Sequence, residues 1–179
     1  IPNDVDFVII SVPAQNVLQV LDDCAIKGVK LVQLFTAGFL ELGDENGRKL
    51  EQQMVAKAKQ AGFRIVGPNC LGISNPAIGT PLGPSMLLGE PGTAGIISQS
   101  GGHATNLVYQ GLARGIGFSK LISLGNACDL DIADFLEYLA IDPETKVIGA
   151  YIEGVPDGKR WLKAASEAAK RKPLVIWKG

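Results

Sequence analysis

The fold class is decided by the stretch Gly95-Ile96-Ile97-Ser98-Gln99-Ser100-Gly101-Gly102. It begins as an apolar run, ends in serines and glycines, and leads into a segment of helical periodicity over about residues 101–114. A buried strand that passes through a tight polar turn into a helix is the repeating unit of doubly wound α/β folds. The stretch therefore predicts a parallel sheet with helices packed on it.

The same alternation of apolar run and periodic segment continues on both sides of this stretch. Further strands are predicted at residues 5–12, 31–36, 63–66, 120–124, 147–152 and 174–177. Helices are predicted at about 16–27, 44–61, 132–140 and 159–172. The strands are nearly continuous in apolar residues, which is typical of parallel sheets covered on both faces. We expect a three-stranded layer followed by a four-stranded one.

The alternation of apolar runs and periodic segments stops over residues 67–94, which contain five prolines: Pro68, Pro76, Pro81, Pro84 and Pro91. This composition is typical of a linker, so we divide the chain into domains at 1–90 and 91–179. The first strand is not followed by a glycine-rich turn, although a mononucleotide-binding fold carries its phosphate turn there. We therefore expect the chain to begin inside a domain.

Composition excludes several classes of protein. The 179 residues include 17 basic and 18 acidic side chains, whereas nucleic-acid-binding domains are typically basic. No apolar run approaches 18 residues and no secretory leader opens the chain, so we expect no membrane span. The three cysteines are widely spaced and predict neither a disulfide framework nor a zinc site, which favours a cytoplasmic protein without a metal centre.

Ligands of open parallel sheets bind beyond the carboxyl ends of the strands. At such an end, Ser98, Ser100, Gly101 and Gly102 would present hydroxyl and amide groups at a helix N-terminus, which favours a phosphate. Simple capping of the helix by Ser100 explains the same residues. The spacing alone leaves both interpretations open.

Other candidate residues have similar alternatives. Glu153 follows a strand and would orient a base or a cation, or be a solvated loop carboxylate. His103, the only histidine, would contact a phosphate from the first helical turn, or pack, or face solvent. Cys70 would lie near a ligand or be a buried structural thiol.

Two charged segments favour structural roles. Asp129 and Asp131 could bind a metal, but acidic residues before a helix more often cap it. The basic run Lys170-Arg171-Lys172 closes a predicted helix, where cations match the helix dipole, so we favour a solvated helix end over a nucleic-acid site.

The strand-end motifs together resemble the NDP-forming acyl-CoA synthetases, the family that includes the α subunit of succinyl-CoA synthetase. They are Ala37-Gly38-Phe39, Gly67-Pro68-Asn69-Cys70-Leu71-Gly72, Gly95–Gly102, Gly117-Phe118-Ser119-Lys120, Gly125-Asn126, Asp142-Pro143-Glu144-Thr145 and Tyr151-Ile152-Glu153-Gly154-Val155. The likeness is closer to the ADP-forming acetyl-CoA synthetases than to succinyl-CoA synthetase.

The resemblance implies the trailing part of a Rossmann-like CoA-binding domain followed by a flavodoxin-like, doubly wound parallel sheet domain. It implies an acid–CoA ligase that forms acyl-CoA from a small carboxylic acid, CoA and ATP, through an acyl phosphate and a phosphohistidine. The phosphoryl group would bind at the helix that begins at Ser100-Gly101-Gly102, and Glu153 would hydrogen-bond the phosphorylated histidine. The implied CoA site consists of Phe35, Thr36, Ala37, Gly38, Asn69 and Cys70.

The resemblance also implies an ATP-grasp partner, either a β subunit or a fused domain, that holds ATP with Mg²⁺, and an oligomeric enzyme. The family's glycine-rich CoA turn and its phosphorylated histidine would lie outside residues 1–179, and His103 does not match that histidine. Thr105 stands where succinyl-CoA synthetase has a tyrosine, so succinate is not favoured. We therefore expect this segment alone to be inactive.

Two other functions compete with the ligase. A CoA-sensing or regulatory module without ligase turnover, such as the homologous region of a protein acetyltransferase, would share these motifs. A flavodoxin-like electron carrier is disfavoured, because the chain has only 11 aromatic residues and no evident flavin-stacking pair.

Overall fold

The computed structural model describes residues 1–83 and 89–179, so Pro84 of the predicted linker lies outside the described residues. The described chain forms two compact units. Unit 1 comprises Ile1–Cys70 and Gly125–Leu130, and unit 2 comprises Leu71–Leu124 and Asp131–Gly179. Three short 3-10 helices, η1 (Ala14–Asn16), η2 (Leu40–Leu42) and η3 (Pro76–Ile78), accompany the main elements.

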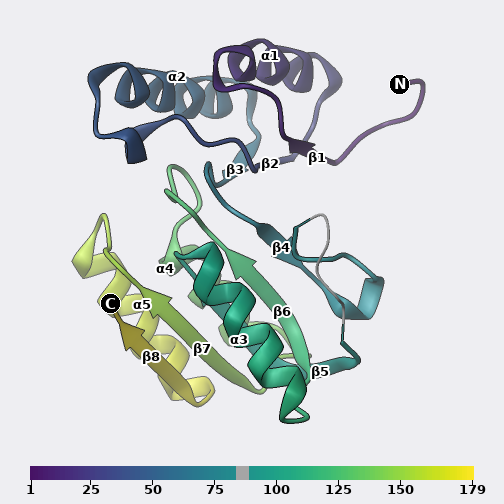
Figure 1. Cartoon of the computed structure of the whole chain (residues 1–179), viewed down its shortest axis with the longest axis vertical. Coiled ribbons are helices and arrows are strands. Elements are labelled where there is room, and N and C mark those ends of the chain that lie inside the picture. Colours follow the sequence, from purple (N-terminus) through teal and green to yellow (C-terminus); the bar gives the residue numbers. More distant parts are fainter. Residues whose placement is uncertain (84–88) are drawn as a thin grey trace. The chain divides into compact units, whose positions relative to one another are not determined.

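Unit 1 is a three-stranded parallel sheet with two helices on one face (Figure 1). Its strands are β1 (Phe7–Ile10), β2 (Leu31–Leu34) and β3 (Arg64–Val66), in the order β1-β2-β3. The helices α1 (Val17–Lys27) and α2 (Glu45–Ala61) contact each other. Right-handed crossovers that advance in one direction place successive helices on the same face. Both helices of the described unit therefore lie on one face of the sheet, although consecutive residues of β2 and β3 are buried, as expected of strands covered on both faces.

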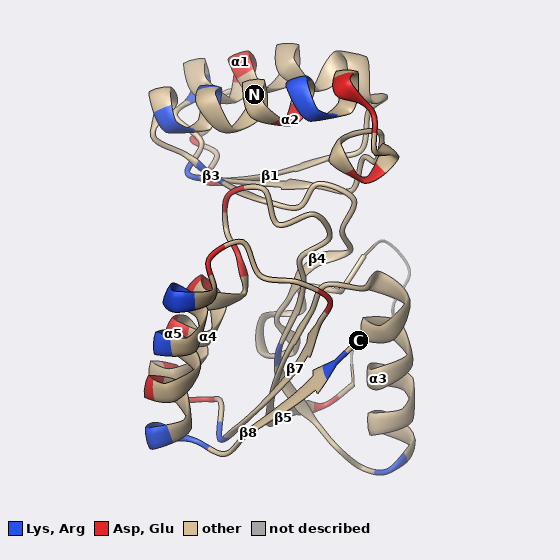
Figure 2. Cartoon of the chain, turned by 90° about the vertical axis from the view of Figure 1, so that its left-hand side faces the viewer, with Lys and Arg blue, Asp and Glu red and all other residues tan. Residues whose placement is uncertain are grey.

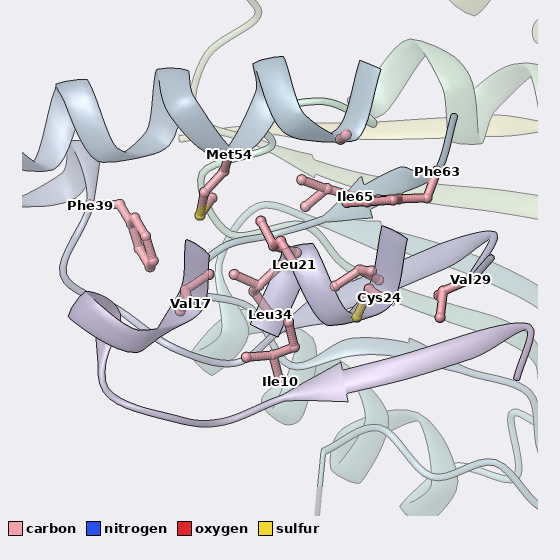
Figure 3. Close-up of a cluster of buried hydrophobic side chains, with 12 residues drawn as sticks. Ile10, Val17, Leu21, Cys24, Val29, Leu34, Phe39, Met54, Phe63 and Ile65 are labelled. Atoms are coloured by element: carbon pink, nitrogen blue, oxygen red, sulfur yellow. The ribbon is translucent and has the colours of Figure 1, made fainter. Parts of the chain in front are cut away.

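The core of unit 1 lies between that sheet and its helices (Figure 3). Leu21 of α1, Met54 of α2 and Ile65 of β3 are each 0% exposed and point into one cluster. The predicted apolar face of α2 is confirmed, because Met54 and Ala58 are buried and Leu50 packs against the same cluster. Burying one such large side chain contributes about 1.5–3 kcal/mol to stability. The cluster therefore stabilises the sheet and holds the ends of its strands in place.

A segment distant in sequence completes unit 1. Gly125–Leu130 lies along the end of β3, where the amides of Asn126, Cys128 and Leu130 donate to the carbonyl oxygens of Pro68, Gly67 and Ile65 at 3.0–3.1 Å. Asp129 accepts from Arg64 Nε at 2.9 Å and from the Ile65 amide at 2.8 Å. The sequence patterns did not predict this return of the chain to unit 1.

Unit 2 is a five-stranded sheet in the order β4-β6-β5-β7-β8. Its strands are β4 (Gly72–Ser74), β5 (Pro91–Ser98), β6 (Phe118–Ser123), β7 (Val147–Ile152) and β8 (Leu174–Lys178). The four predicted parallel strands are confirmed, but β4 is an additional antiparallel strand inside the predicted linker. A strand of three residues among prolines and glycines is too short for an alternating pattern to reveal it.

Helices cover both faces of this sheet, as the doubly wound prediction requires (Figure 2). One face carries α3 (Gly101–Ala113), and the other carries α4 (Ile132–Ile141) and α5 (Gly158–Arg171). The central strand β5 pairs with β6 on one side and with β7 on the other, so the crossovers leave in opposite directions. In register across the sheet, Ser98 lies beside Ser123 and Tyr151, and Tyr151 lies beside Trp177.

A buried ionic network ties β6 to the turn after α4. Lys120 is 6% exposed and its Nζ lies 3.5 Å from Asp142 Oδ2, with Glu144 as a second partner. Asp142 also accepts from Thr145 Oγ1 at 2.6 Å. Burial opposes ionisation of Asp142, but the Thr145 hydrogen bond and the Lys120 charge outweigh it and lower the pKa of this carboxyl group.

Replacing Lys120 by methionine is expected to lower the free energy of unfolding by about 3–5 kcal/mol, because Asp142 is then buried without its cation. Since the folded-state pKa of Asp142 is depressed, its stabilising effect is present above the unfolded value and is lost as the pH falls through the folded one. Denaturant unfolding measured at pH 7 and at a series of lower values down to about pH 2 tests both effects, because the contribution of Asp142 should persist at pH 4 and disappear below it. Lys146→Met, at an exposed lysine nearby, should change stability by less than about 0.5 kcal/mol.

No helix in residues 1–83 and 89–179 is long and apolar enough to cross a membrane.

Candidate functional site

The turn from β5 into α3 is built by its two serines. Ser98 is fully buried and its Oγ donates to the Ser100 carbonyl oxygen at 2.7 Å. Ser100 is the N-cap of α3, and its Oγ accepts from the His103 amide at 3.3 Å. The capping interpretation is confirmed, and it is compatible with an anion site. In the described chain no group accepts from the amides of Gly101 and Gly102, which belong to the first turn, where helices leave N–H groups unpaired.

Gln99 fixes the loop after β7 to this turn. Its Nε2 donates to the Gly154 carbonyl oxygen at 2.7 Å, and its Oε1 accepts from the amides of Gly154, at 3.0 Å, and of Glu153. The backbone of Glu153 is thereby held at the same edge of the sheet as Ser100. The sequence patterns assigned no role to the Gln99 side chain, although its position between Ser98 and Ser100 could have indicated one.

The Glu153 side chain is exposed to solvent at this edge. Burial of Tyr151, together with the Glu153 charge and a hydrogen bond to it, raises the pKa of the Tyr151 phenol. Lys178 of β8 donates to the Glu153 carbonyl oxygen at 3.1 Å. Glu153 is thus a carboxylate whose backbone is anchored from two neighbouring strands, which suits a group that must meet a partner in a fixed direction.

His103 packs in an aromatic cluster formed with Tyr151 and Trp177. Its ring stacks on Tyr151 at a centroid distance of 4.2 Å, and Trp177 meets both rings edge-on at 5.0 Å. His103 Nδ1 lies 2.9 Å from Ser100 Oγ. The structure thus favours packing for His103 and also brings it to the capping serine. The partners Tyr151 and Trp177 were missed, because only strand register places them beside each other.

In unit 1, the two stretches that the resemblance assigns to CoA lie together beyond β2 and β3. The Asn69 amide donates to the Thr36 carbonyl oxygen at 2.9 Å, and Thr36 Oγ1 donates to the Val12 carbonyl oxygen at 2.7 Å. Phe35 and Gly38 are partly exposed, and Ala37 and Asn69 are exposed. Asn69 has a positive φ of 56°, a left-handed conformation that asparagine adopts more readily than most residues.

Two residues of this region are committed to internal hydrogen bonds. Cys70 is 5% exposed and its thiol donates to the Leu34 carbonyl oxygen at 3.2 Å, which fits the structural alternative. The Gly38 amide donates to Glu41 Oε1 at 2.5 Å. Gly38 therefore offers a ligand close approach of its backbone, at a φ of 109° that few other residues adopt, rather than its N–H group.

A carboxylate pair and an amide brace the same region, and sequence reasoning missed this cluster. Asn126 Nδ2 donates to Glu41 Oε2 at 2.5 Å and to Glu51 Oε2 at 2.9 Å. Burial opposes ionisation of Glu41, but hydrogen bonds from Asn126 and from the Gly38 amide lower the pKa of its carboxyl group. The loop that holds Gly38 is thus tied to the returning segment through Asn126, which gives the Gly125-Asn126 motif a positioning role.

The remaining charged candidates have structural partners. Asp131 forms a capping box with Asp134 at the start of α4, as predicted, and both pair with Arg160 of α5. No group of metal-ligating side chains is present among residues 1–83 and 89–179. Lys170 pairs with Glu167 at 2.6 Å, and Lys172 donates to the Leu139 and Asp142 carbonyl oxygens.

Comparison with known proteins matches both units to one enzyme family. Residues 1–76 match a CoA binding domain, and residues 91–179 match a succinyl-CoA ligase-like flavodoxin domain. The α subunit of ADP-forming acetate–CoA ligase II of Pyrococcus furiosus is 44% identical over 99% of this chain and 38% of its own length. The chain belongs to the NDP-forming acyl-CoA synthetase family. The predicted resemblance and fold class are thereby confirmed.

Other members of this family give the same picture. The 4-hydroxybutyrate–CoA ligase [ADP-forming] of Nitrosopumilus maritimus is 38% identical over 99% of this chain and 26% of its own length. A solved structure of the dinucleotide-forming acetyl-coenzyme A synthetase 1 of Ca. Korarchaeum cryptofilum, in complex with phosphate and ADP, has a TM-score of 0.90. It is 38% identical, with 99% of this chain and 38% of that chain covered. The chain therefore spans well under half the length of these relatives.

Proposed function

We propose that the protein containing this chain is an NDP-forming acid–CoA ligase in which the chain supplies the CoA-binding and phosphoryl-binding surfaces. One observation carries the proposal. Ser100, the unpaired amides of Gly101 and Gly102, and Glu153 are held at one sheet edge of a chain from this synthetase family. The domain division at 1–90 and 91–179 is part of the same proposal.

The N-terminus of α3 would hold the phosphoryl group while the acyl phosphate forms. The amides of Gly101 and Gly102, the Ser100 hydroxyl and the helix dipole all favour negative charge there. Ser98 is buried beneath the turn and would shape it through its bond to Ser100. The CoA thiolate then attacks the acyl carbon, the bond to the phosphate oxygen breaks, and inorganic phosphate leaves with the bonding electrons.

Glu153 would accept a hydrogen bond from one ring nitrogen of the phosphorylated histidine, which lies outside this chain. That bond leaves the other nitrogen unprotonated, so it can attack the γ-phosphorus of ATP while the bond to the β–γ bridging oxygen breaks and ADP leaves. The Glu153 carboxylate stabilises the positive charge that develops on the ring. A carboxylate oxygen of the acid would then attack the same phosphorus as the N–P bond breaks, which forms the acyl phosphate. The anchoring by Gln99 and Lys178 would keep the Glu153 backbone in place during the transfer.

Coenzyme A would lie on unit 1 along Phe35, Thr36, Ala37, Gly38 and Asn69. The exposure of Ala37 and Asn69 and the positive φ of Gly38 support a surface that a ligand approaches closely. We assign Cys70 to support of this surface, because its thiol is bonded to Leu34 beneath the turn.

The other components belong to the whole protein. An ATP-grasp β subunit or fused domain would hold ATP with Mg²⁺, and a small carboxylic acid would be activated in a cytoplasmic, oligomeric enzyme. The acetate and 4-hydroxybutyrate ligases among the relatives support a short acid.

The experiment uses the full-length protein with its ATP-grasp partner, ATP, CoA and a panel of short acids. We expect one acyl-CoA, one ADP and one phosphate per turnover, measured by chromatography and phosphate release. Tight CoA binding with no acid-dependent ADP release for any acid would contradict the ligase and support a CoA-sensing module.

A further inference from the structure

We propose that His103 is a positioning residue that turns the Ser100 hydroxyl proton toward an anion bound at the N-terminus of α3. The inference rests on the proposed function, because the anion is the phosphoryl group that the proposed site would hold. It follows from three contacts of the described chain: the Ser100 cap, the His103 ring beside it, and the aromatic side chains that hold this ring.

Counting donors and acceptors shows why His103 matters. A serine hydroxyl has one proton and two lone pairs, and one lone pair of Ser100 Oγ already accepts the His103 amide. Nδ1 lies 2.9 Å from the same oxygen. If Nδ1 carries no proton, the Ser100 proton must point to it, and the hydroxyl has none to offer an anion. If Nδ1 is protonated, it fills the second lone pair, and the Ser100 proton is free to point outward.

Two aromatic side chains hold the His103 ring in the orientation in which Nδ1 reaches Ser100 Oγ. Tyr151 lies parallel to it, with an interplanar angle of 12°, and Trp177 lies edge-on at 85°. Tyr151 is 7% exposed, so its ring is fixed by the sheet, and each of these aromatic contacts contributes about 0.5–1.5 kcal/mol beyond area burial. A ring held on two sides keeps Nδ1 directed at Ser100 Oγ.

Anion affinity should therefore depend on the proton count of His103. When both ring nitrogens carry a proton, Nδ1–H is present and a positive charge is added near the anion. The titratable groups on the elements packed against the ring are Tyr151 and Glu153 at the end of β7 and Lys178 on β8. The pKa of Tyr151 is raised, so the phenol keeps its proton between pH 5 and 8, where histidine titrates.

The test measures binding of sulfate, whose charge is constant over this range, to the full-length protein with its partner by calorimetry at pH 5.5 and 8.0. We expect wild-type affinity to be about tenfold higher at pH 5.5, the size of one hydrogen bond to a charged group. His103→Asn, which supplies a donor that does not titrate, should bind with a pH-independent affinity. His103→Leu should bind about tenfold more weakly than the wild type at pH 5.5.

A double-mutant cycle with Ser100→Ala isolates this pair from every other anion site of the protein. Adding His103→Leu to Ser100→Ala should cost much less affinity than adding it to the wild type. If the affinity losses of Ser100→Ala and His103→Leu are additive in the double variant, the inference is overturned. It is also overturned if sulfate affinity depends on pH in His103→Asn as in the wild type, and this dependence disappears in Glu153→Gln. If Ser100→Ala binds sulfate like the wild type at both pH values, the phosphoryl site itself is wrong. If Ser100→Ala weakens binding while both His103 variants behave as wild type, only the role of His103 is wrong.

Discussion

Replacing Gly102 by aspartate is expected to lower the rate of acyl-CoA formation at least about 100-fold without unfolding the protein. The new carboxylate would lie in the first turn of α3, beside the proposed phosphoryl group. Two like charges about 4 Å apart repel by roughly 4 kcal/mol at the effective dielectric of a protein surface, before screening by salt. The same carboxylate interacts favourably with the positive N-terminal end of the helix dipole, so the free energy of unfolding should be unchanged or raised.

Matched variants separate charge from size at this position. A Cβ atom added to Gly102 would meet only Ser100 Oγ, at 3.9 Å, so Gly102→Ala is expected to fold and to keep activity within about threefold. Gly102→Asn has nearly the shape of aspartate without the charge. Steady-state rates and thermal unfolding of the three variants are compared. Wild-type turnover in Gly102→Asp would remove the α3 N-terminus from the mechanism.

Replacing Glu153 by glutamine is expected to slow phosphoryl transfer about 100-fold. The amide keeps the size of the side chain but loses the charge that would stabilise the histidine ring as it becomes positive. Because Gln99 and Lys178 bind the backbone around residue 153, the loop should stay in place, and the KM for CoA should be unchanged. Single-turnover transfer from ATP, followed by rapid quench, measures the step directly.

Glu167→Gln provides the control for this prediction, because Glu167 is an exposed glutamate of α5 whose partner is Lys170. It should transfer at the wild-type rate. If Glu153→Gln also does so, Glu153 is only a loop carboxylate, as one interpretation of the sequence allowed.

Local patterns predicted most of the secondary structure. The apolar runs and the helical face of Leu50, Met54 and Ala58 depend only on near neighbours in the sequence, and the structure confirms them within a few residues. Asp131 was predicted as a cap for the same reason, since capping acts within one helical turn. Local periodicity could not show which face of a sheet the crossovers cover, so it did not predict that α1 and α2 share one face of the unit 1 sheet (Figure 1).

The candidate site was predictable only where its residues follow strands. Ser98, Ser100, Gly101, Gly102 and Glu153 lie at strand ends, and the structure places them at one edge of the sheet. The contacts that hold them were not predictable, because they join residues distant in sequence. Gln99 reaches Gly154, His103 meets Tyr151 and Trp177, and Asn126 meets Glu41 and Glu51. Such pairs depend on strand register and on where loops return to in the fold, and neither produces a periodic pattern in the sequence.

If this chain is the CoA- and phosphoryl-binding part of a ligase that works through a phosphohistidine, the protein should carry a transient phosphoryl group during turnover. The most direct test incubates the full-length protein and its ATP-grasp partner with ATP labelled at the γ-phosphate, then adds acid and CoA. We expect base-stable, acid-labile label on a histidine outside residues 1–179, and loss of that label as acyl-CoA and inorganic phosphate appear. No protein-bound label, or a label that persists after acid and CoA are added, would contradict it.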